Sequence, residues 1–223
     1  AVCPFASMAG AANTVIQTIQ LGIPVARIEI IDEVQLRVVN AYSKTNYPLE
    51  PTLFFEFHGI SDVAVEDQIR AVEEIARENG AKGFKWASSL DDRNTLWQAR
   101  HNAYYAAVAS RPGARAWTTD VCVPISHLAQ CISETQEDLK THQVEAPLVG
   151  HAGDGNFHLI IMLNPDDPAE LALITGISER LVERALKYGG TCTGEHGVGF
   201  GKLKYLDAEH GAALDVMRSI KRA

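Results

Sequence analysis

The chain has 223 residues, of which 46% are hydrophobic, so it can bury one substantial core. Its formal net charge of −8 and the lack of a long Lys/Arg run exclude the electrostatic surface of a nucleic-acid-binding protein. The apolar runs are too short for a transmembrane helix, and the first residues lack the layout of a signal peptide. The sequence predicts a soluble globular domain with no nucleic-acid partner.

Helical periodicity alternates with short apolar strands along the whole chain. Helices are predicted at residues 8–21, 33–42, 63–79, 90–109, 126–141, 168–188 and 208–222. Strands are predicted at residues 26–31, 52–57, 83–87 and 157–163. Because residues 26–31 alternate polar and apolar side chains, the pattern favours an α+β fold with an antiparallel sheet and helices on one face.

The cysteines are far apart in the sequence and form no C-x-x-C pair: Cys3, Cys122, Cys131 and Cys192. A domain of this size does not need disulfide bonds to fold. Four reduced thiols in a cytosolic or mitochondrial-matrix compartment are therefore expected.

Two glycine-rich polar segments, residues 149–158 and 191–199, contain the groups best suited to chemistry. In the first, His151 is expected to end one strand and His158 to open the next, with a Gly-Asp-Gly-Asn turn between them. Such a turn brings both imidazoles to one end of a sheet. Their spacing is not that of a zinc finger or of H-E-x-x-H, so spacing alone favours two structural histidines.

The second segment changes this balance, because it adds Glu195 and His196 among glycines that allow close backbone approach. Two imidazoles and a carboxylate, from His151, His158 and Glu195, form the ligand set of an open divalent-metal site. His196 then has a different task. The ordinary pKa of imidazole, about 6.5, suits a general base at neutral pH. The alternative is a subunit interface in which the histidines are structural.

The glycines of the second segment do not form a phosphate-binding loop. Gly201 and Lys202 are followed by Leu203, and Gly197 lies one residue too close for the P-loop interval. The dinucleotide pattern G-x-G-x-x-G also fails after Gly199. Nucleotide binding through this loop is therefore not expected.

Arg100 lies on the aromatic side of the predicted helix at residues 90–109, at helical spacing from Trp97 and Tyr104. A planar guanidinium in this position is suited to binding a carboxylate with two hydrogen bonds. The alternative is an amphipathic helix whose arginine pairs with a structural acid such as Asp120. The residues alone leave both interpretations open.

These segments resemble the C-terminal domain of FAD-linked oxidases of the vanillyl-alcohol-oxidase type. Both parts of the signature are present in order, Gly-His-Ala-Gly-Asp-Gly-Asn-Phe-His at residues 150–158 and Cys-Thr-Gly-Glu-His-Gly-Val-Gly at residues 192–199. Residues 90–102 and 118–126 look like the D-lactate dehydrogenase branch, and the similarity runs from about residue 3 to residue 222. The resemblance implies a duplicated ferredoxin-like α+β domain.

The resemblance also implies roles for individual residues. The family's metal ligands, for Zn, Mn or Fe, match His151, His158 and Glu195. His196 matches the catalytic base, and Arg100 matches the residue that holds the substrate carboxylate. Asn156 lies where the family places a polar group beside substrate and flavin, and Glu195 is also expected near the flavin.

The reaction implied by the resemblance is the FAD-dependent oxidation of a small 2-hydroxy carboxylate, with D-lactate as the first candidate. Glycolate and D-2-hydroxyglutarate are alternatives, although the longer diacid needs a second cationic group that the sequence does not reveal. A non-catalytic metal-binding ferredoxin-like module is a further alternative, but it has no use for a base beside a ligand. The resemblance leaves room for a homodimer and places the protein in the bacterial cytoplasm or mitochondrial matrix, with peripheral contact to the inner membrane as an option.

Family members carry an N-terminal FAD-binding domain with its own pyrophosphate loop, and nothing like it occurs in this sequence. They also end in an Asp-Pro…Asn-Pro-Gly-Lys tail, whereas this chain ends in Ile-Lys-Arg-Ala. Residues 1–223 are therefore expected to form one substrate-and-metal domain that works with an FAD domain outside this chain. The isolated domain is expected to be colourless and inactive.

Overall fold

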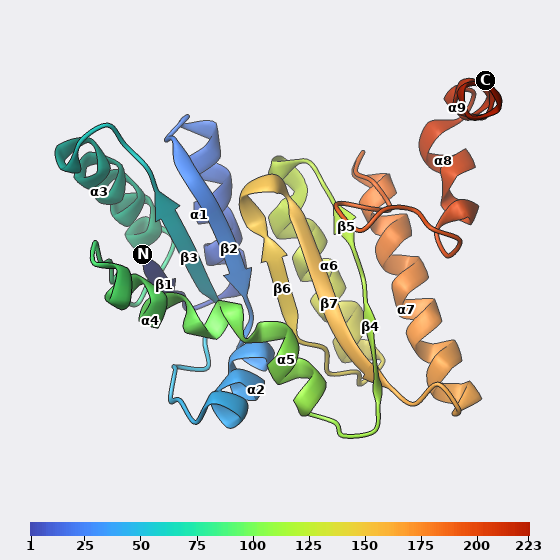
Figure 1. Ribbon diagram of the computed structural model, residues 1–223, viewed down its shortest axis with the longest axis horizontal. Helices are drawn as coiled ribbons and strands as arrows, with labels where there is room; N and C mark the ends of the chain where they lie inside the picture. Colours follow the sequence, from blue (N-terminus) through green and yellow to red (C-terminus); the bar gives the residue numbers. More distant parts are fainter.

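The computed structural model describes residues 1–223 as one seven-stranded sheet flanked by helices (Figure 1). The strands are β1 (Val2–Pro4), β2 (Val25–Ile31), β3 (Thr52–Phe57), β4 (Arg115–Thr118), β5 (Val121–Cys122), β6 (Leu148–His151) and β7 (Asn156–Leu163). Their order is β1-β3-β2-β6-β7-β4, β5 also pairs with β7, and every pair is antiparallel. The predicted antiparallel α+β fold is confirmed.

Nine α-helices connect or flank these strands. They are α1 (Met8–Gln20), α2 (Glu33–Ser43), α3 (Asp62–Glu78), α4 (Leu90–His101), α5 (Ala103–Ala109), α6 (Leu128–Thr141), α7 (Pro168–Lys187), α8 (Leu206–His210) and α9 (Ala213–Arg222). Short 3₁₀ turns lie at η1 (Ile125–His127), η2 (Ala152–Asp154) and η3 (Leu203–Tyr205). No helix combines the length and the apolar character needed to cross a bilayer. All four cysteines are free thiols, as predicted.

The sheet is built from two halves with the same topology. The first half runs β1-α1-β2-β3-α3 and returns beside β1 through a bridge between Val2 and Lys85. The second half runs β5-α6-β6-β7-α7 and returns beside β5 through a bridge between Cys122 and Thr191. The two halves join where β2 pairs with β6. This repeated strand order confirms the predicted ferredoxin-like duplication.

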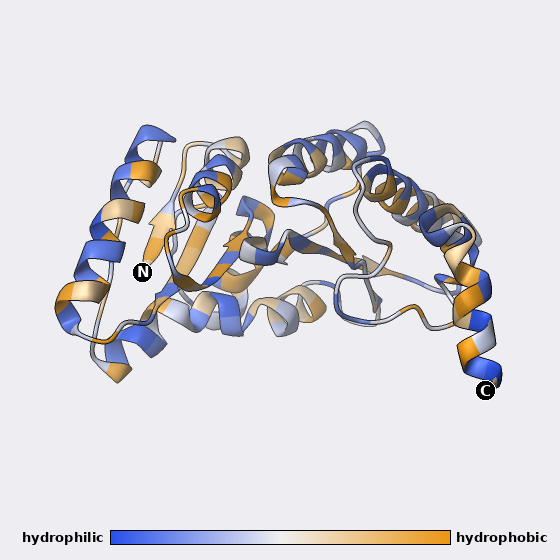
Figure 2. Cartoon of the chain, turned by 90° about the horizontal axis from the view of Figure 1, so that it is seen from above, coloured by the Kyte–Doolittle hydropathy of each residue, from blue (hydrophilic) through white to orange (hydrophobic).

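Side-chain alternation divides the buried residues into two layers, one on each face of the sheet. The larger layer includes Phe55 and Phe157 and lies under the long helices α1, α3, α6 and α7. The smaller layer includes Phe54, Ile160 and Trp97 of α4 and is covered by α2, α4 and α5. Figure 2 shows helices on both faces of the sheet. The predicted arrangement on one face therefore describes the four long helices of the two repeated units, and α2, α4 and α5 cover part of the other face.

Three predicted elements differ from the structure. The predicted helix at residues 90–109 is interrupted at Asn102, whose side-chain amide donates to the hydroxyl of Ser43 on α2. The predicted helix at residues 208–222 is interrupted at Gly211, which has a φ of +51°. The predicted strand at residues 83–87 is reduced to the single bridge at Lys85, because only this residue reaches the edge of β1.

Candidate active site and metal centre

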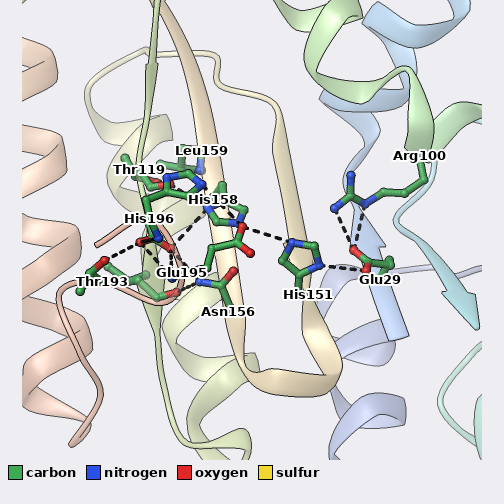
Figure 3. A network of polar contacts seen from close by, with 12 residues as sticks. Glu29, Arg100, Thr119, His151, Asn156, His158, Leu159, Thr193, Glu195 and His196 are labelled. Atoms are coloured by element: carbon green, nitrogen blue, oxygen red, sulfur yellow. Dashed lines mark hydrogen bonds and ion pairs between the residues drawn. The ribbon is translucent and has the colours of Figure 1, made fainter. Parts of the chain in front are cut away.

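The candidate residues gather at the β6–β7 hairpin and on the loop after α7, on the sheet face that α4 covers (Figure 3). His151 ends β6 and pairs with Asn156, the first residue of β7. Gly155 has a φ of +78°, and a Cβ there would lie 2.1 Å from a backbone carbonyl oxygen, so only glycine fits this turn. The predicted turn is confirmed, with His158 as the third residue of its strand rather than the first.

His158 has one bonded ring nitrogen and one buried nitrogen without a hydrogen-bond partner. Its Nδ1 lies 2.9 Å from the carbonyl oxygen of Thr119, which can only accept, so Nδ1 carries the proton. Its Nε2 is the unpartnered atom. Burial of the ring lowers the pKa of His158, which favours the neutral form with a lone pair on Nε2. An imidazole oriented in this way is typical of a metal ligand.

His151 is oriented by Glu29, a buried carboxylate on β2. Nδ1 of His151 lies 2.9 Å from Glu29 Oε1, and this hydrogen bond is the main reason that the pKa of His151 is raised. The other ring nitrogen, Nε2, lies 3.3 Å from Oε1 of Glu195. A carboxylate bonded to the far nitrogen of an imidazole is the usual outer support of a histidine metal ligand.

Glu195 completes this group from the loop after α7. Its Oε1 lies 3.1 Å from Nε2 of His158, and the three residues His151, His158 and Glu195 each offer a ligand atom within 4.8 Å of the others. Asp120, His158 and His196 form a second group within this distance. The Asp120 carboxylate already accepts hydrogen bonds from several donors, so its oxygens are less available. The donor chemistry therefore fits a divalent cation best at the first group.

His196 lies beside these three residues without being one of them. Its ring stacks on that of His158, with centroids 5.0 Å apart and planes inclined by 9°. Its Nε2 is 3.5 Å from Glu195 Oε1, and about half of the side chain, 47%, is exposed. A general base must lie within reach of the hydroxyl that it deprotonates. The structure brings His196 to the expected place, and its catalytic role stays a prediction.

Arg100 is held by Glu29 rather than by the acid considered from the sequence. Its Nε and Nη2 lie 3.0 and 2.8 Å from Oε2 of Glu29. The alternative considered from the sequence, a pair between Arg100 and a structural acid, is therefore present, but Asp120 was the wrong acid because it pairs with Lys202. Burial alone would raise the pKa of Glu29, but the hydrogen bond from His151 and the charge of Arg100 outweigh burial and lower it. Arg100 is thus linked to His151 through one shared carboxylate.

Asn156 is the first residue of β7, directly after the turn of the β6–β7 hairpin. Its Nδ2 donates to Asp120 Oδ1 at 3.0 Å and to the carbonyl oxygen of Val121 at 2.9 Å, while its Oδ1 is buried without a partner. Its place beside substrate and flavin stays a prediction.

Glu29 was missed by the sequence analysis, although one signal was present. It is a carboxylate between Ile28 and Ile30, in the buried half of β2, where an acid needs a specific partner.

A groove of about 850 Å³ lies elsewhere, between α2, α5 and α7. Its two arginines, Arg37 and Arg111, are paired with Glu145 and Glu170. None of the candidate residues lines it. The candidate site is therefore defined by its polar cluster and not by a deep cavity within this chain.

Residues 1–223 match the family model described as FAD linked oxidases, C-terminal domain. The probable mitochondrial D-lactate dehydrogenase of Danio rerio is 48% identical over 222 residues, which cover 99% of this chain and 44% of that protein. The mitochondrial D-lactate dehydrogenase (cytochrome) of Arabidopsis thaliana is 41% identical over 223 residues, which cover 100% of this chain and 39% of that protein. The chain thus spans less than half the length of these curated relatives.

Two further similarities are more distant. The glycolate oxidase subunit GlcD of Bacillus subtilis is 29% identical over 219 residues, 96% of this chain and 45% of that protein. Among solved structures, 4-ethylphenol oxidase from Gulosibacter chungangensis, in its isoeugenol complex, has a TM-score of 0.69 at 13% identity and covers 99% of this chain and 49% of its own. At 13% identity, the similarity to 4-ethylphenol oxidase supports the fold alone.

Proposed function

Because the chain belongs to the family of FAD-linked oxidase C-terminal domains, we propose that it is the substrate-and-metal half of a flavin-dependent D-2-hydroxy-acid dehydrogenase that oxidises D-lactate. The observation that carries the proposal is that Oε1 of Glu195 lies 3.1 Å from Nε2 of buried His158 and 3.3 Å from Nε2 of His151. Because His158 carries its proton on Nδ1, no proton lies between its Nε2 and this carboxylate, and Nε2 has no hydrogen-bond partner. A purely structural histidine in this position would leave that lone pair unsatisfied at a cost in stability. The names of the D-lactate dehydrogenase relatives support the substrate.

In this proposal, His151, His158 and Glu195 hold a divalent cation, which when bound supplies Lewis-acid polarisation of the substrate hydroxyl oxygen. FAD, held mainly by a domain outside this chain, supplies the acceptor for the hydride from C2 of the substrate. His196 takes the hydroxyl proton on its imidazole, a step for which a positioned histidine is the commonest protein base. The proton and the hydride together account for the two electrons and two protons that leave the alcohol.

Arg100 binds the substrate carboxylate in this proposal. Its side chain is 19% exposed, and Glu29 holds its Nε and Nη2 and so fixes the plane of the guanidinium. The same Glu29 orients His151, so the carboxylate-binding group and a metal ligand keep a fixed relation to one another. Asn156 and Glu195 lie beside the flavin. A small 2-hydroxy acid needs no further cation, which favours D-lactate over D-2-hydroxyglutarate.

Glycolate is the second candidate substrate, supported by the similarity to the glycolate oxidase subunit of Bacillus subtilis. The two substrates differ by one methyl group at C2, and one methyl in an apolar pocket is worth roughly 1–3 kcal/mol in discrimination. The mitochondrial relatives favour a mitochondrial-matrix location for the proposed enzyme.

The test uses the full-length enzyme with its FAD domain. Reduction of the flavin is followed by absorbance under anaerobic conditions after mixing with D-lactate, L-lactate, glycolate or D-2-hydroxyglutarate. D-lactate should reduce the flavin fastest, L-lactate should be inert, and removal of metal by a chelator should abolish reduction until the metal is restored. Fast reduction by L-lactate, or full activity in metal-free enzyme, would contradict the proposal.

A further inference from the structure

The loop that carries Glu195 and His196 has little structure of its own. Residues 192–202 contain no helix and no strand, and both side chains are 47% exposed. A metal ligand and a base nevertheless need a fixed relative position, because small displacements of reacting groups lower the rate steeply. The group that holds this loop must therefore come from another element.

Asp120, between β4 and β5, is that group. Its carboxylate is 1% exposed and accepts from the backbone amides of Glu195 (3.2 Å) and His196 (3.0 Å). Two side chains from the same segment also donate to it, the Thr193 hydroxyl at 2.8 Å and the Lys202 ammonium at 3.1 Å. One buried carboxylate thus binds the loop at both ends and at the two residues proposed to do the chemistry.

Asp120 itself is fixed to the sheet. The neighbouring residue Thr119 donates its amide to the Leu159 carbonyl oxygen on β7, and β5 pairs with β7 immediately after Asp120. The side-chain amide of Asn156 donates to the same carboxylate at 3.0 Å. Because β7 also carries His158, Asp120 sets the distance between the loop and that histidine.

The loop approaches Asp120 as closely as the backbone allows. A Cβ on Gly194 would lie 1.9 Å from Nδ2 of Asn156 and 3.0 Å from Oδ1 of Asp120, so only glycine fits between Thr193 and Glu195. Burial opposes ionisation of Asp120, but the hydrogen bonds from the loop and from Asn156 hold its pKa well below the usual range. Asp120 is therefore an anion at neutral pH, which strengthens each of these hydrogen bonds.

We propose that Asp120 is a positioning residue that fixes the Glu195-His196 loop against the β6–β7 hairpin and so completes the metal site. The inference rests on the proposed function. Asp120 does not bind the metal, because its oxygens are used by the loop donors. Its effect on metal binding passes through the backbone of Glu195, and its effect on proton transfer passes through the backbone of His196.

The experiment compares Asp120→Asn with Asp138→Asn in the full-length enzyme. An asparagine at position 120 offers one acceptor instead of two and turns an NH₂ group toward the loop donors. The Kd for Zn²⁺ should rise by about 10–100-fold, and the visible absorption of the Co²⁺-loaded protein should change, because Glu195 loses its geometry. Asp138 is also nearly buried and paired with arginines, on α6, so its variant should lose stability and leave both metal readouts unchanged.

Two outcomes separate this inference from the proposed function. If His158→Ala loses Zn²⁺ while Asp120→Asn keeps the original Kd and Co²⁺ spectrum, the positioning role is wrong and the metal site stands. If His158→Ala keeps its Zn²⁺, the proposed metal site is wrong and the inference falls with it.

A milder variant covers the case in which Asp120→Asn fails to fold. Thr193→Val removes only the hydroxyl donor to Asp120 and nearly preserves the volume of the side chain. A several-fold rise in the Kd for Zn²⁺ would support the inference, and an unchanged Kd would overturn it.

Discussion

The two ferredoxin-like halves share a strand order but connect their middle strands differently. In the second half, β6 turns into β7 through residues 152–155. In the first half, residues 32–51 separate β2 from β3 and include α2. The inserted helix packs with α5 over buried side chains such as Phe54, whereas the tight turn leaves the ends of β6 and β7 open for polar groups.

Because of this difference, the two halves of the duplicated domain supply different side chains to the candidate site. The second half supplies His151 and His158 from its hairpin. The first half supplies Glu29, which orients His151 and holds Arg100. The candidate site therefore lies across the junction of β2 and β6, and the groups of one half depend on a buried carboxylate of the other.

The largest expected effect lies in the second half, at His196. In the full-length enzyme, His196→Ala should lower turnover by about 10²–10⁴-fold with the metal retained, because it removes a proton acceptor and not a ligand. Glu195→Gln is the matched variant, and it should lower metal occupancy first, with part of the activity restored by excess metal. Metal content measured beside steady-state kinetics at several metal concentrations distinguishes the two variants. If only His196→Ala were rescued by metal, the two roles would have to be exchanged.

The next effect tests whether the second half depends on the first. Glu29→Gln keeps the shape of the side chain but removes the charge that faces His151 and Arg100. The Kd for Zn²⁺ should rise by about 10–100-fold, and the KM for D-lactate should rise as well, because Arg100 loses its fixed orientation. The control is Glu56→Gln on β3, which removes a carboxylate of the same half that is paired with Arg27. Equal metal affinities of the two variants would mean that the second half works without Glu29.

The smallest expected effect concerns stability in the first half and is set by Asp32. Burial raises the pKa of this carboxyl to about 7, although the backbone amides of Gln35 and Leu148 donate to it. An aspartate in an unfolded chain titrates near pH 3.9. The stabilisation from the protonated carboxyl is therefore complete below about pH 4 and is lost as the pH rises through about 7.

Asp32→Asn keeps an acceptor for both amides and removes this pH dependence. The free energy of unfolding should rise by roughly 1–2 kcal/mol at pH 8 and change little at pH 4, since weaker neutral hydrogen bonds offset part of the gain. Urea unfolding at the two pH values gives the comparison, with the exposed Asp67→Asn on α3 as the control for a change of net charge. A loss of stability at pH 8 would show that the charged carboxylate is favourable in the fold.

Much of the fold follows from local features of the sequence. The helices predicted at residues 8–21, 33–42 and 168–188 match α1, α2 and α7 to within one residue, because apolar spacing and capping act over a few positions. Ser7, for example, accepts from the first-turn amide of Gly10. The strand at residues 83–87 failed for the opposite reason, since its partner β1 lies far away in the sequence and only one residue reaches it.

The candidate site shows the same contrast between local sequence features and contacts between residues far apart in the sequence. The sequence by itself identified His151, His158, Glu195 and His196, because polar groups among glycines mark a place where the backbone must approach something closely. Only the tertiary structure decided what surrounds them. Glu29 lies 122 residues from His151 in the sequence, and Asp120 lies 75 residues from Glu195. A buried carboxylate is stable only with specific donors, and strand pairing across the sheet determines which donors it meets.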